Sequence, residues 1–290
     1  MLESHLVSLV MNKRTINVGM FIFAFLVAIL FTSLLTLVNP CALVGPLEPV
    51  PPVRIENIDN RPKPPIVGYC DPAEYDENVD YAKKLKVKLL LAGDLHSDEV
   101  PYRSGEVWVG LFEGSAGLEL AKTSIEINRG KKDELFNTSV STTRKRESIF
   151  LLRDATNLRP GPVQTVFNSK NEEFSVPFRE SGNQKTYKFN DSLYILRIEN
   201  PNPEGFLQDG SALVLENEGR EQVIRYLTYD CDDCGWSVDW VGDLDRDGKL
   251  DFFLDLSSHY NSYNPTLFLS TLAENGKIVG IFAGFHGVGC

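Results

Sequence analysis

Short runs of apolar residues follow one another from about residue 85 to the C-terminus, separated by clusters of Gly, Asn, Pro and Ser. The runs are rich in Val, Ile, Leu, Phe and Tyr, and runs of this length bounded by turn-forming residues are typical of β-strands. The predicted strands are 85–91, 107–113, 148–153, 163–167, 193–198, 212–215, 223–229, 252–256, 267–271 and 277–283.

Helical patterns are rare in this part of the chain. Only 75–86 and 116–122 have weak helical periodicity, and Asn275-Gly276 predicts a tight hairpin turn between the last two strands. Many short strands with few helices predict an all-β domain, built as a sandwich or a barrel-like sheet. A boundary between two smaller units is an alternative near 155–185.

The N-terminus carries a long apolar segment. Residues 18–38 contain no charge and follow Lys13 and Arg14, and the run is long enough to cross a hydrocarbon core of about 30 Å. We therefore expect an N-terminal hydrophobic helix in 1–40 that is either a signal peptide or a membrane anchor. Lipidation at Cys41 is a further alternative, although Pro40 does not fit the small residue that lipidation requires. Each interpretation keeps the basic residues inside and exports the rest.

Residues 41–66 are rich in proline, which favours an extended spacer over packed structure. The predicted organisation is therefore 1–40 as signal peptide or anchor, 41–66 as linker, and 67–290 as an extracytoplasmic β-rich domain. The expected location is the periplasm, the cell surface or the medium, with 18–38 as an anchor if it is retained.

The chain has a formal net charge of −11. Such an acidic protein is not expected to bind nucleic acid or anionic membrane surfaces, because both repel it. Membrane contact is expected through the N-terminal segment alone.

Four cysteines follow Cys41, an even number that fits two disulfides in an exported protein. Cys231 and Cys234 form a Cys-x-x-Cys pair, which also occurs in redox and zinc sites. No second such pair exists and an acidic loop, not a helix, follows, so we expect disulfides. The favoured bond joins Cys231 or Cys234 to Cys290 and would tie the end of the chain to the start of the acidic hairpin.

The strongest chemical signal is the stretch 242–251, Gly-Asp-Leu-Asp-Arg-Asp-Gly-Lys-Leu-Asp. Ca²⁺ prefers six to eight oxygen ligands, and a tight acidic loop can supply them. We expect side-chain oxygens from Asp243, Asp245 and Asp247, the backbone carbonyl of Lys249, and Asp251 to close the ring. The alternative is a plain Asp-Gly hairpin turn, but a turn alone does not need four acidic residues that repel one another.

The loop differs from an EF-hand, because the twelfth position holds Leu254 and the following residues alternate like a strand. The segment from Val241 to Phe253 resembles the calcium loop of FG-GAP/VCBS-like β-repeat modules, such as those of integrin α-chain propellers. This resemblance covers about 15 residues and implies a calcium-loop hairpin that leads into a strand. Residues 92–99 repeat the motif only faintly, without the glycine and the closing acid, so a full propeller is not expected. The segment 242–290 also resembles the ends of exported bacterial proteins that carry one such loop.

Catalytic motifs are nearly absent. The segment 113–117 lacks the first glycine of a nucleophile elbow, and His96, His259 and His286 suggest no Ser-His-Asp set. Glu172-Glu173 is typical of a solvated loop. Four aromatic residues near the acidic loop could bind a sugar, but buried support for the loop is favoured: Trp236, Trp240, Tyr260 and Tyr263.

We therefore expect an exported calcium-binding β protein that is non-enzymatic and has an unknown protein or glycan partner. The alternatives are a secreted hydrolase with an unrecognised active site, and a cell-surface adhesion or interaction module.

Overall fold

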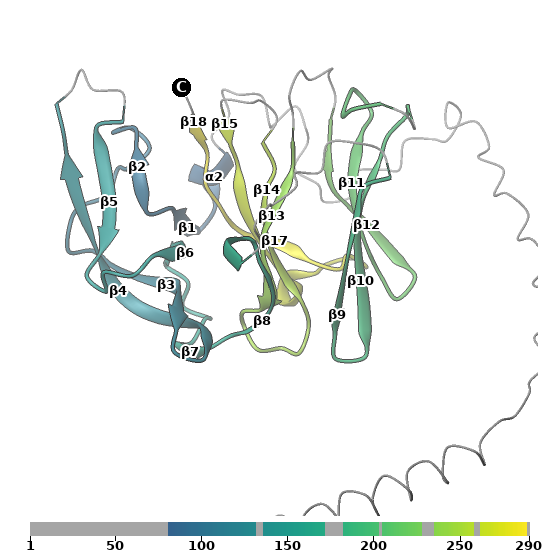
Figure 1. Ribbon diagram of the computed structural model, residues 1–290, viewed down its shortest axis with the longest axis horizontal. Helices are drawn as coiled ribbons and strands as arrows, with labels where there is room; N and C mark the ends of the chain where they lie inside the picture. Colours follow the sequence, from purple (N-terminus) through teal and green to yellow (C-terminus); the bar gives the residue numbers. More distant parts are fainter. Residues whose placement is uncertain are drawn as a thin grey trace, which may run out of the picture. The chain divides into compact units, whose positions relative to one another are not determined.

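The computed structural model describes residues 81–131, 136–171, 182–202, 205–227, 235–257 and 262–288 (Figure 1). All of them belong to one compact unit, Ile58–Cys290. The hydrophobic segment, the linker, all five cysteines, Glu172-Glu173, His259 and Tyr260 lie outside the described residues. Within the described ranges, every helix is too short or too polar to span a bilayer.

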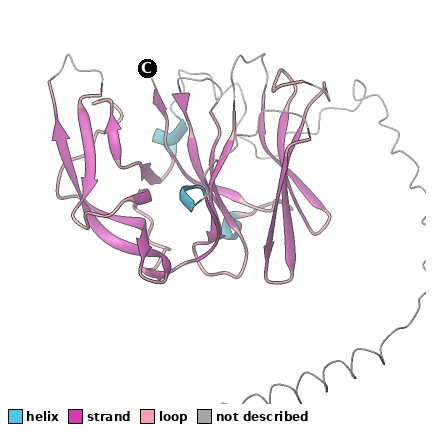
Figure 2. Ribbon diagram, in the orientation of Figure 1, coloured by secondary structure: helices cyan, strands magenta, loops and turns pink. Residues whose placement is uncertain are grey.

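The described chain is mostly β-structure (Figure 2). One sheet contains β1 Val87–Leu90, β2 Gly93–Leu95, β3 Val107–Gly114, β4 Gly117–Arg129, β5 Thr138–Thr142, β6 Ser148–Arg153, β7 Gly161–Pro162, β8 Gln164–Asn168, β13 Ser237–Asp243, β14 Asp251–Asp255, β16 Pro265–Leu269 and β17 Gly280–Gly284. A second sheet contains β9 Gln184–Phe189, β10 Ser192–Glu199, β11 Ala212–Asn217 and β12 Arg220–Tyr226, and a small ribbon joins β15 Ser262–Tyr263 to β18 Gly287–Val288. The helical pieces are α2 Tyr81–Lys84, η3 Ser169–Asn171 and η4 Ser270–Leu272.

Each of the ten predicted strands overlaps an observed strand, which confirms the all-β prediction. The predicted turn at Asn275-Gly276 is also confirmed. Both residues have positive φ, 51° and 82°, and the Lys277 N–H donates to the Glu274 carbonyl across the turn. The turn lies within the connection 270–279 between the antiparallel strands β16 and β17, which also contains η4, so it does not join the two strands directly as a two-residue hairpin loop would. The observed helix α2 lies inside the predicted range 75–86, of which 75–80 is outside the described residues.

The predicted helix at 116–122 is wrong, because these residues form the turn and the first half of β4. A tight turn pairs Gly114 with Gly117, whose φ of 118° is readily adopted only by glycine. Beyond the turn Leu118 and Leu120 are buried on one side of the strand. Their period of two matches a strand, and the run of good helix formers in Leu-Glu-Leu-Ala-Lys is overridden by pairing with β3.

The large sheet has the order β2-β5-β4-β3-β6-β1-β17-β16-β14-β13-β8, with β7 beside β4, and it curls into a half barrel (Figure 1). The first six strands of this order come from residues 87–153. Of the last five, β8 precedes the second sheet in the sequence, and β13, β14, β16 and β17 follow it. The two parts meet where β1 pairs in parallel with β17, with Val87 opposite Ala283. The other strand pairs of the described chain are antiparallel.

The strands around the acidic loop are buried on both faces. Phe253 on β14 packs into the core of the curled part, while its neighbour Phe252 packs against the four-stranded sheet. On β13, Trp240 likewise packs into the core of the curled part, and Val241 packs against the four-stranded sheet. Full burial of such side chains contributes about 1.5–3 kcal/mol each. The hairpin that carries the loop therefore starts from a part of the molecule that is fixed from two sides.

Candidate metal centre

The acidic loop connects β13 to β14, and the last paired residues at its base are Gly242 and Asp251. A Cβ atom at position 242 would lie 2.3 Å from the carbonyl oxygen of Gln164 and 2.5 Å from the Trp240 ring, so only glycine fits there. The glycine thus lets the neighbouring strand β8 and the indole pack directly against the base of the loop. Gly248, with a φ of 85°, then reverses the chain toward β14.

Three aspartates of the loop come together. Each of Asp243, Asp245 and Asp247 offers a carboxylate oxygen, and these atoms all lie within 4.8 Å of one another. Asp243 is buried, Asp245 is half-buried and Asp247 is exposed, so the group extends from the core to the surface. The sequence prediction that these residues could hold a metal ion is confirmed at this level, while the identity of the ion is a separate question.

Asp243 also shapes the loop. Its two carboxylate oxygens accept hydrogen bonds from the backbone N–H groups of Asp247 and Gly248, each at 3.0 Å. These bonds fold the loop around the carboxylate of its own first residue. Burial is the main reason that the pKa of Asp243 is raised from its usual value, and the charge of Asp247 raises it further.

Asp245 carries the most informative atom of the site. Its Oδ2 accepts a hydrogen bond from the Thr271 hydroxyl, whereas its Oδ1 is buried without a hydrogen-bond partner. A buried carboxylate oxygen without a partner is costly, and such atoms are rare in folded proteins. A cation among the three aspartates would supply the missing interaction. The donor set is entirely carboxylate oxygen, which fits a hard cation.

Asp247 is held by a residue far along the chain. Its Oδ2 accepts a hydrogen bond of 2.9 Å from the Ser270 hydroxyl, and its Oδ1 accepts the Lys249 backbone N–H at 2.9 Å. Ser270 and Thr271 lie in η4, directly after β16, so the strand next to β14 provides a hydroxyl to two of the three aspartates. Nothing in the sequence near 242–251 pointed to these hydroxyls.

Asp251, the fifth predicted ligand residue, lies outside the group of three. It is completely buried, and its Oδ2 and Oδ1 accept the backbone N–H groups of Leu244 and Ser270 at 2.7 Å and 2.8 Å. Burial raises the pKa of Asp251 well above its usual value, and the charge of Asp245 adds to this. In this geometry Asp251 ties the loop to β16 and η4. Lys249 is exposed, as expected for a residue that would offer only its carbonyl.

Other contacts fix the outside of the loop. The Arg246 guanidinium donates hydrogen bonds to the carbonyls of Arg159 and Pro162, at 3.1 Å and 3.2 Å. The Asn190 side chain donates to the carbonyl of Gly248 at 3.0 Å. Arg246 directs its cation away from the aspartates to backbone acceptors, so it does not neutralise them by an ion pair among the described residues.

The aromatic residues near the loop serve the core. Trp236 and Trp240 are completely buried, which agrees with the expectation that they support the loop, and neither is available to stack on a sugar. The half-buried Tyr263 donates its hydroxyl hydrogen bond to Glu99 at 3.3 Å. Residues 92–99, the faint second copy of the motif, contribute β2 and a turn, and their acidic residues form no metal-binding group in the described chain.

No known family model matches this chain, and the curated proteins and the solved structures also give no match. The resemblance to FG-GAP/VCBS-like modules therefore rests on the loop alone. Fold and site together define a β protein with a curled sheet and an aspartate loop that could hold a metal ion.

Proposed function

We propose that this chain is an exported, non-enzymatic calcium-binding β protein, in which the ion stabilises the β13–β14 hairpin. The observation that carries the proposal is the buried Oδ1 of Asp245, which has no hydrogen-bond partner although it belongs to a group of three aspartates. Asp243 and Asp247 would share the ion with it. The ion would satisfy this oxygen and would also screen the repulsion among the three carboxylates.

Calcium fits the donors better than the other common ions. Zn²⁺ prefers nitrogen and sulfur ligands in a tetrahedral site, and Mg²⁺ demands a strict octahedron in which it keeps several waters. Ca²⁺ accepts a flexible set of carboxylate and carbonyl oxygens. As the FG-GAP-like resemblance implies, the Lys249 carbonyl and Asp251 would complete the set. Asp251 could do so only through lone pairs that its two N–H donors leave available.

Calcium binding by the full chain tests this proposal. We expect isothermal titration to find one Ca²⁺ site per chain, with Mg²⁺ binding more weakly. Asp245→Asn removes one negative charge and an anionic ligand, and it should abolish binding. Asp94→Asn is the matched control, because it makes the same change at an exposed residue of β2 and should leave binding intact. Calcium that binds equally well to the Asp245→Asn chain would contradict the proposal.

The location follows from the N-terminal segment and agrees with calcium use. We propose that 1–40 directs export, that 18–38 remains as an anchor if it is not cleaved, and that 41–66 spaces the domain 67–290 from the membrane. The domain would then work in the periplasm, on the cell surface or in the medium, where it would meet a protein or glycan partner and no nucleic acid. The acidic charge of −11 supports the last point.

Protease accessibility checks this topology. Because Lys13 and Arg14 are expected to stay on the cytoplasmic side, residues beyond about 45 should be exposed on the outer face of the cytoplasmic membrane. Protease added to intact spheroplasts should therefore degrade the domain, while a cytoplasmic marker protein stays whole. Full protection of the domain until the spheroplasts are lysed would show that it is not exported.

A further inference from the structure

A second candidate site lies in a cavity of about 810 Å³ that shares no lining residue with the aspartate loop. Its wall includes Lys88 on β1, Arg153 on β6, Tyr102, Phe285 and His286. The volume is in the range of pockets that bind small organic molecules. The cavity combines cationic and aromatic side chains, so the charges of its wall indicate what it could hold.

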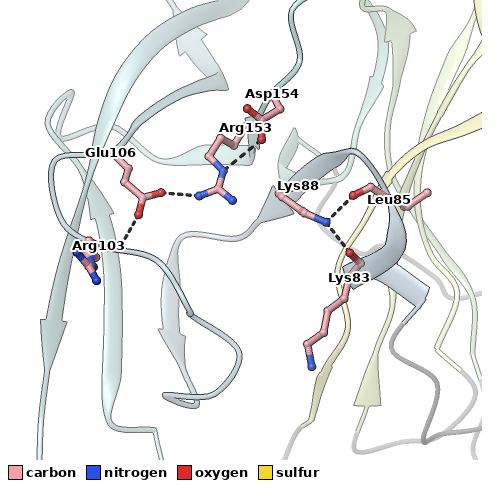
Figure 3. Close-up of polar contacts among 7 residues, drawn as sticks. All are labelled: Lys83, Leu85, Lys88, Arg103, Glu106, Arg153 and Asp154. Carbon is pink, nitrogen blue, oxygen red and sulfur yellow. Dashed lines mark hydrogen bonds and ion pairs between the residues drawn. The ribbon is translucent and has the colours of Figure 1, made fainter.

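Two cationic residues of this wall are register partners, although their charged groups are directed to different neighbours, as Figure 3 shows. Lys88 and Arg153 are register partners on the adjacent antiparallel strands β1 and β6. Side chains of such partners point to the same face, with Cβ atoms about 4.5–5.5 Å apart, and like charges in this position destabilise a sheet. Exceptions to such local rules are often found at functional sites.

Two carboxylates, those of Glu106 and Asp154, lie beside Arg153, and they engage two of its three guanidinium nitrogens. Its Nη1 pairs with Glu106 at 2.6 Å and its Nε lies 3.5 Å from Asp154 (Figure 3). The guanidinium also lies over the Tyr102 ring, 4.7 Å from its centroid. Its remaining nitrogen, Nη2, makes no hydrogen bond with the described residues. Glu106 is itself shared, because its other oxygen accepts the Arg103 backbone N–H at 2.9 Å.

Lys88 has no carboxylate partner among the described residues. Its ammonium group donates to the backbone carbonyls of Lys83 and Leu85 at the end of α2, which leaves its third N–H without an acceptor there (Figure 3). Carbonyls solvate the charge but do not neutralise it. The half-buried Lys88 therefore has no ion pair among the described residues, although its register partner is also a cation and the protein is acidic as a whole.

The two acidic residues that line the cavity, Asp98 and Glu99, form no ion pair with Lys88 or Arg153. Both oxygens of Glu99 are engaged: Oε1 accepts the Val288 N–H at 2.7 Å, and Oε2 accepts the His96 N–H at 2.9 Å and the Tyr263 hydroxyl at 3.3 Å. Glu99 thus ties the turn after β2 to β15 and β18. Asp98 is exposed and forms no ion pair among the described residues.

We propose that this cavity binds a small organic molecule through a carboxylate group. The unused N–H of Lys88 and the Nη2 of Arg153 would each donate to one carboxylate oxygen, which relieves the repulsion between the two cations. Tyr102 and Phe285 would contact the apolar part of the molecule. Two free donors match the two oxygens of a singly charged group, which is why a carboxylate fits here. The inference does not depend on calcium binding.

Titration of the full chain with matched probe pairs tests the inference. D-Glucuronate is compared with D-glucose, and N-acetyl-L-phenylalanine with its amide, so that the two arms separate an acidic sugar from a peptide C-terminus. We expect at least one acid to bind about tenfold more tightly than its neutral partner, the effect of one charge-assisted hydrogen bond. Added salt should weaken that binding. Equal affinity for both members of both pairs would overturn the inference.

Two variants assign the binding to the cationic pair. Lys88→Gln and Arg153→Gln should each remove most of the preference for the acid. Lys170→Gln is the control, because its ammonium is paired with Glu147 at 2.7 Å outside the cavity wall, and it should keep the preference. Lys88→Gln removes a like-charge register contact together with the hydrogen bonds to the carbonyls of Lys83 and Leu85, so we expect the melting temperature to change little. Its calcium binding should be unchanged. An acid preference that survives in both cavity variants would place the anion elsewhere and reject this site.

Discussion

Removal of calcium is expected to lower the melting temperature of this protein by about 5–10 °C. An ion that binds only the folded state adds RT ln(1 + [Ca²⁺]/Kd), about 2.7 kcal/mol at a hundredfold excess over Kd. For a domain of this size, one kcal/mol shifts the melting temperature by about 2–4 °C. Without the ion, the carboxylates of Asp243, Asp245 and Asp247 repel one another within 4.8 Å, and the hairpin loses this stabilisation. Thermal melting followed by circular dichroism, with calcium or with excess chelator, measures the difference.

Variants of the loop connect this difference to the site. Asp245→Ala should lower the melting temperature in calcium and should remove most of the effect of the chelator, because it deletes the carboxylate with the buried unpartnered oxygen. Lys249→Ala should change little, since its exposed side chain is not a ligand. If neither the natural chain nor Asp245→Ala responded to chelator, a plain Asp-Gly hairpin would be the better account of this loop.

Replacement of Asp251 by alanine is expected to destabilise the protein by about 2–4 kcal/mol, both with and without calcium. The change would leave the buried N–H groups of Leu244 and Ser270 without acceptors, and each unsatisfied group costs about 1–3 kcal/mol. Burial raises the pKa of Asp251, so part of this loss is offset because a buried charge disappears. Chemical denaturation at fixed calcium and at excess chelator gives the two free energies of unfolding.

The comparison of Asp251→Ala with Asp245→Ala separates two roles in one loop. Asp245→Ala should differ from the natural chain mainly when calcium is present, whereas Asp251→Ala should differ in both conditions. A loss that is confined to calcium-containing buffer in the Asp251→Ala protein would show that Asp251 acts as a ligand and that its two hydrogen bonds contribute little.

The local parts of this structure were predictable from the sequence. A two-residue turn at Asn275-Gly276 depends on residues that tolerate positive φ, and the approach of Asp243, Asp245 and Asp247 follows from their alternate spacing in one short loop. Strands with dense apolar runs, such as β6 and β14, were also predicted correctly, because the apolar run is itself a local signal. Strands with few apolar residues were missed: β5 reads Thr-Ser-Val-Ser-Thr and β9 reads Gln-Lys-Thr-Tyr-Lys-Phe. Their pairing is decided by neighbouring strands, so local apolar content carries little signal.

The remaining features were decided by contacts between distant residues. The helical pattern of 116–122 yielded to pairing with β3, and the parallel contact of β1 with β17 joins residues almost 200 positions apart, as Val87 and Ala283 show. The hydroxyls of Ser270 and Thr271, the burial of the Asp245 oxygen and the opposition of Lys88 and Arg153 all depend on sheet order. Local sequence determined the strands with dense apolar runs and the position of the acidic loop, because turn geometry and side-chain period act over a few residues. Only the tertiary structure decided which charges are left without partners, because that depends on which strands are adjacent in the sheet.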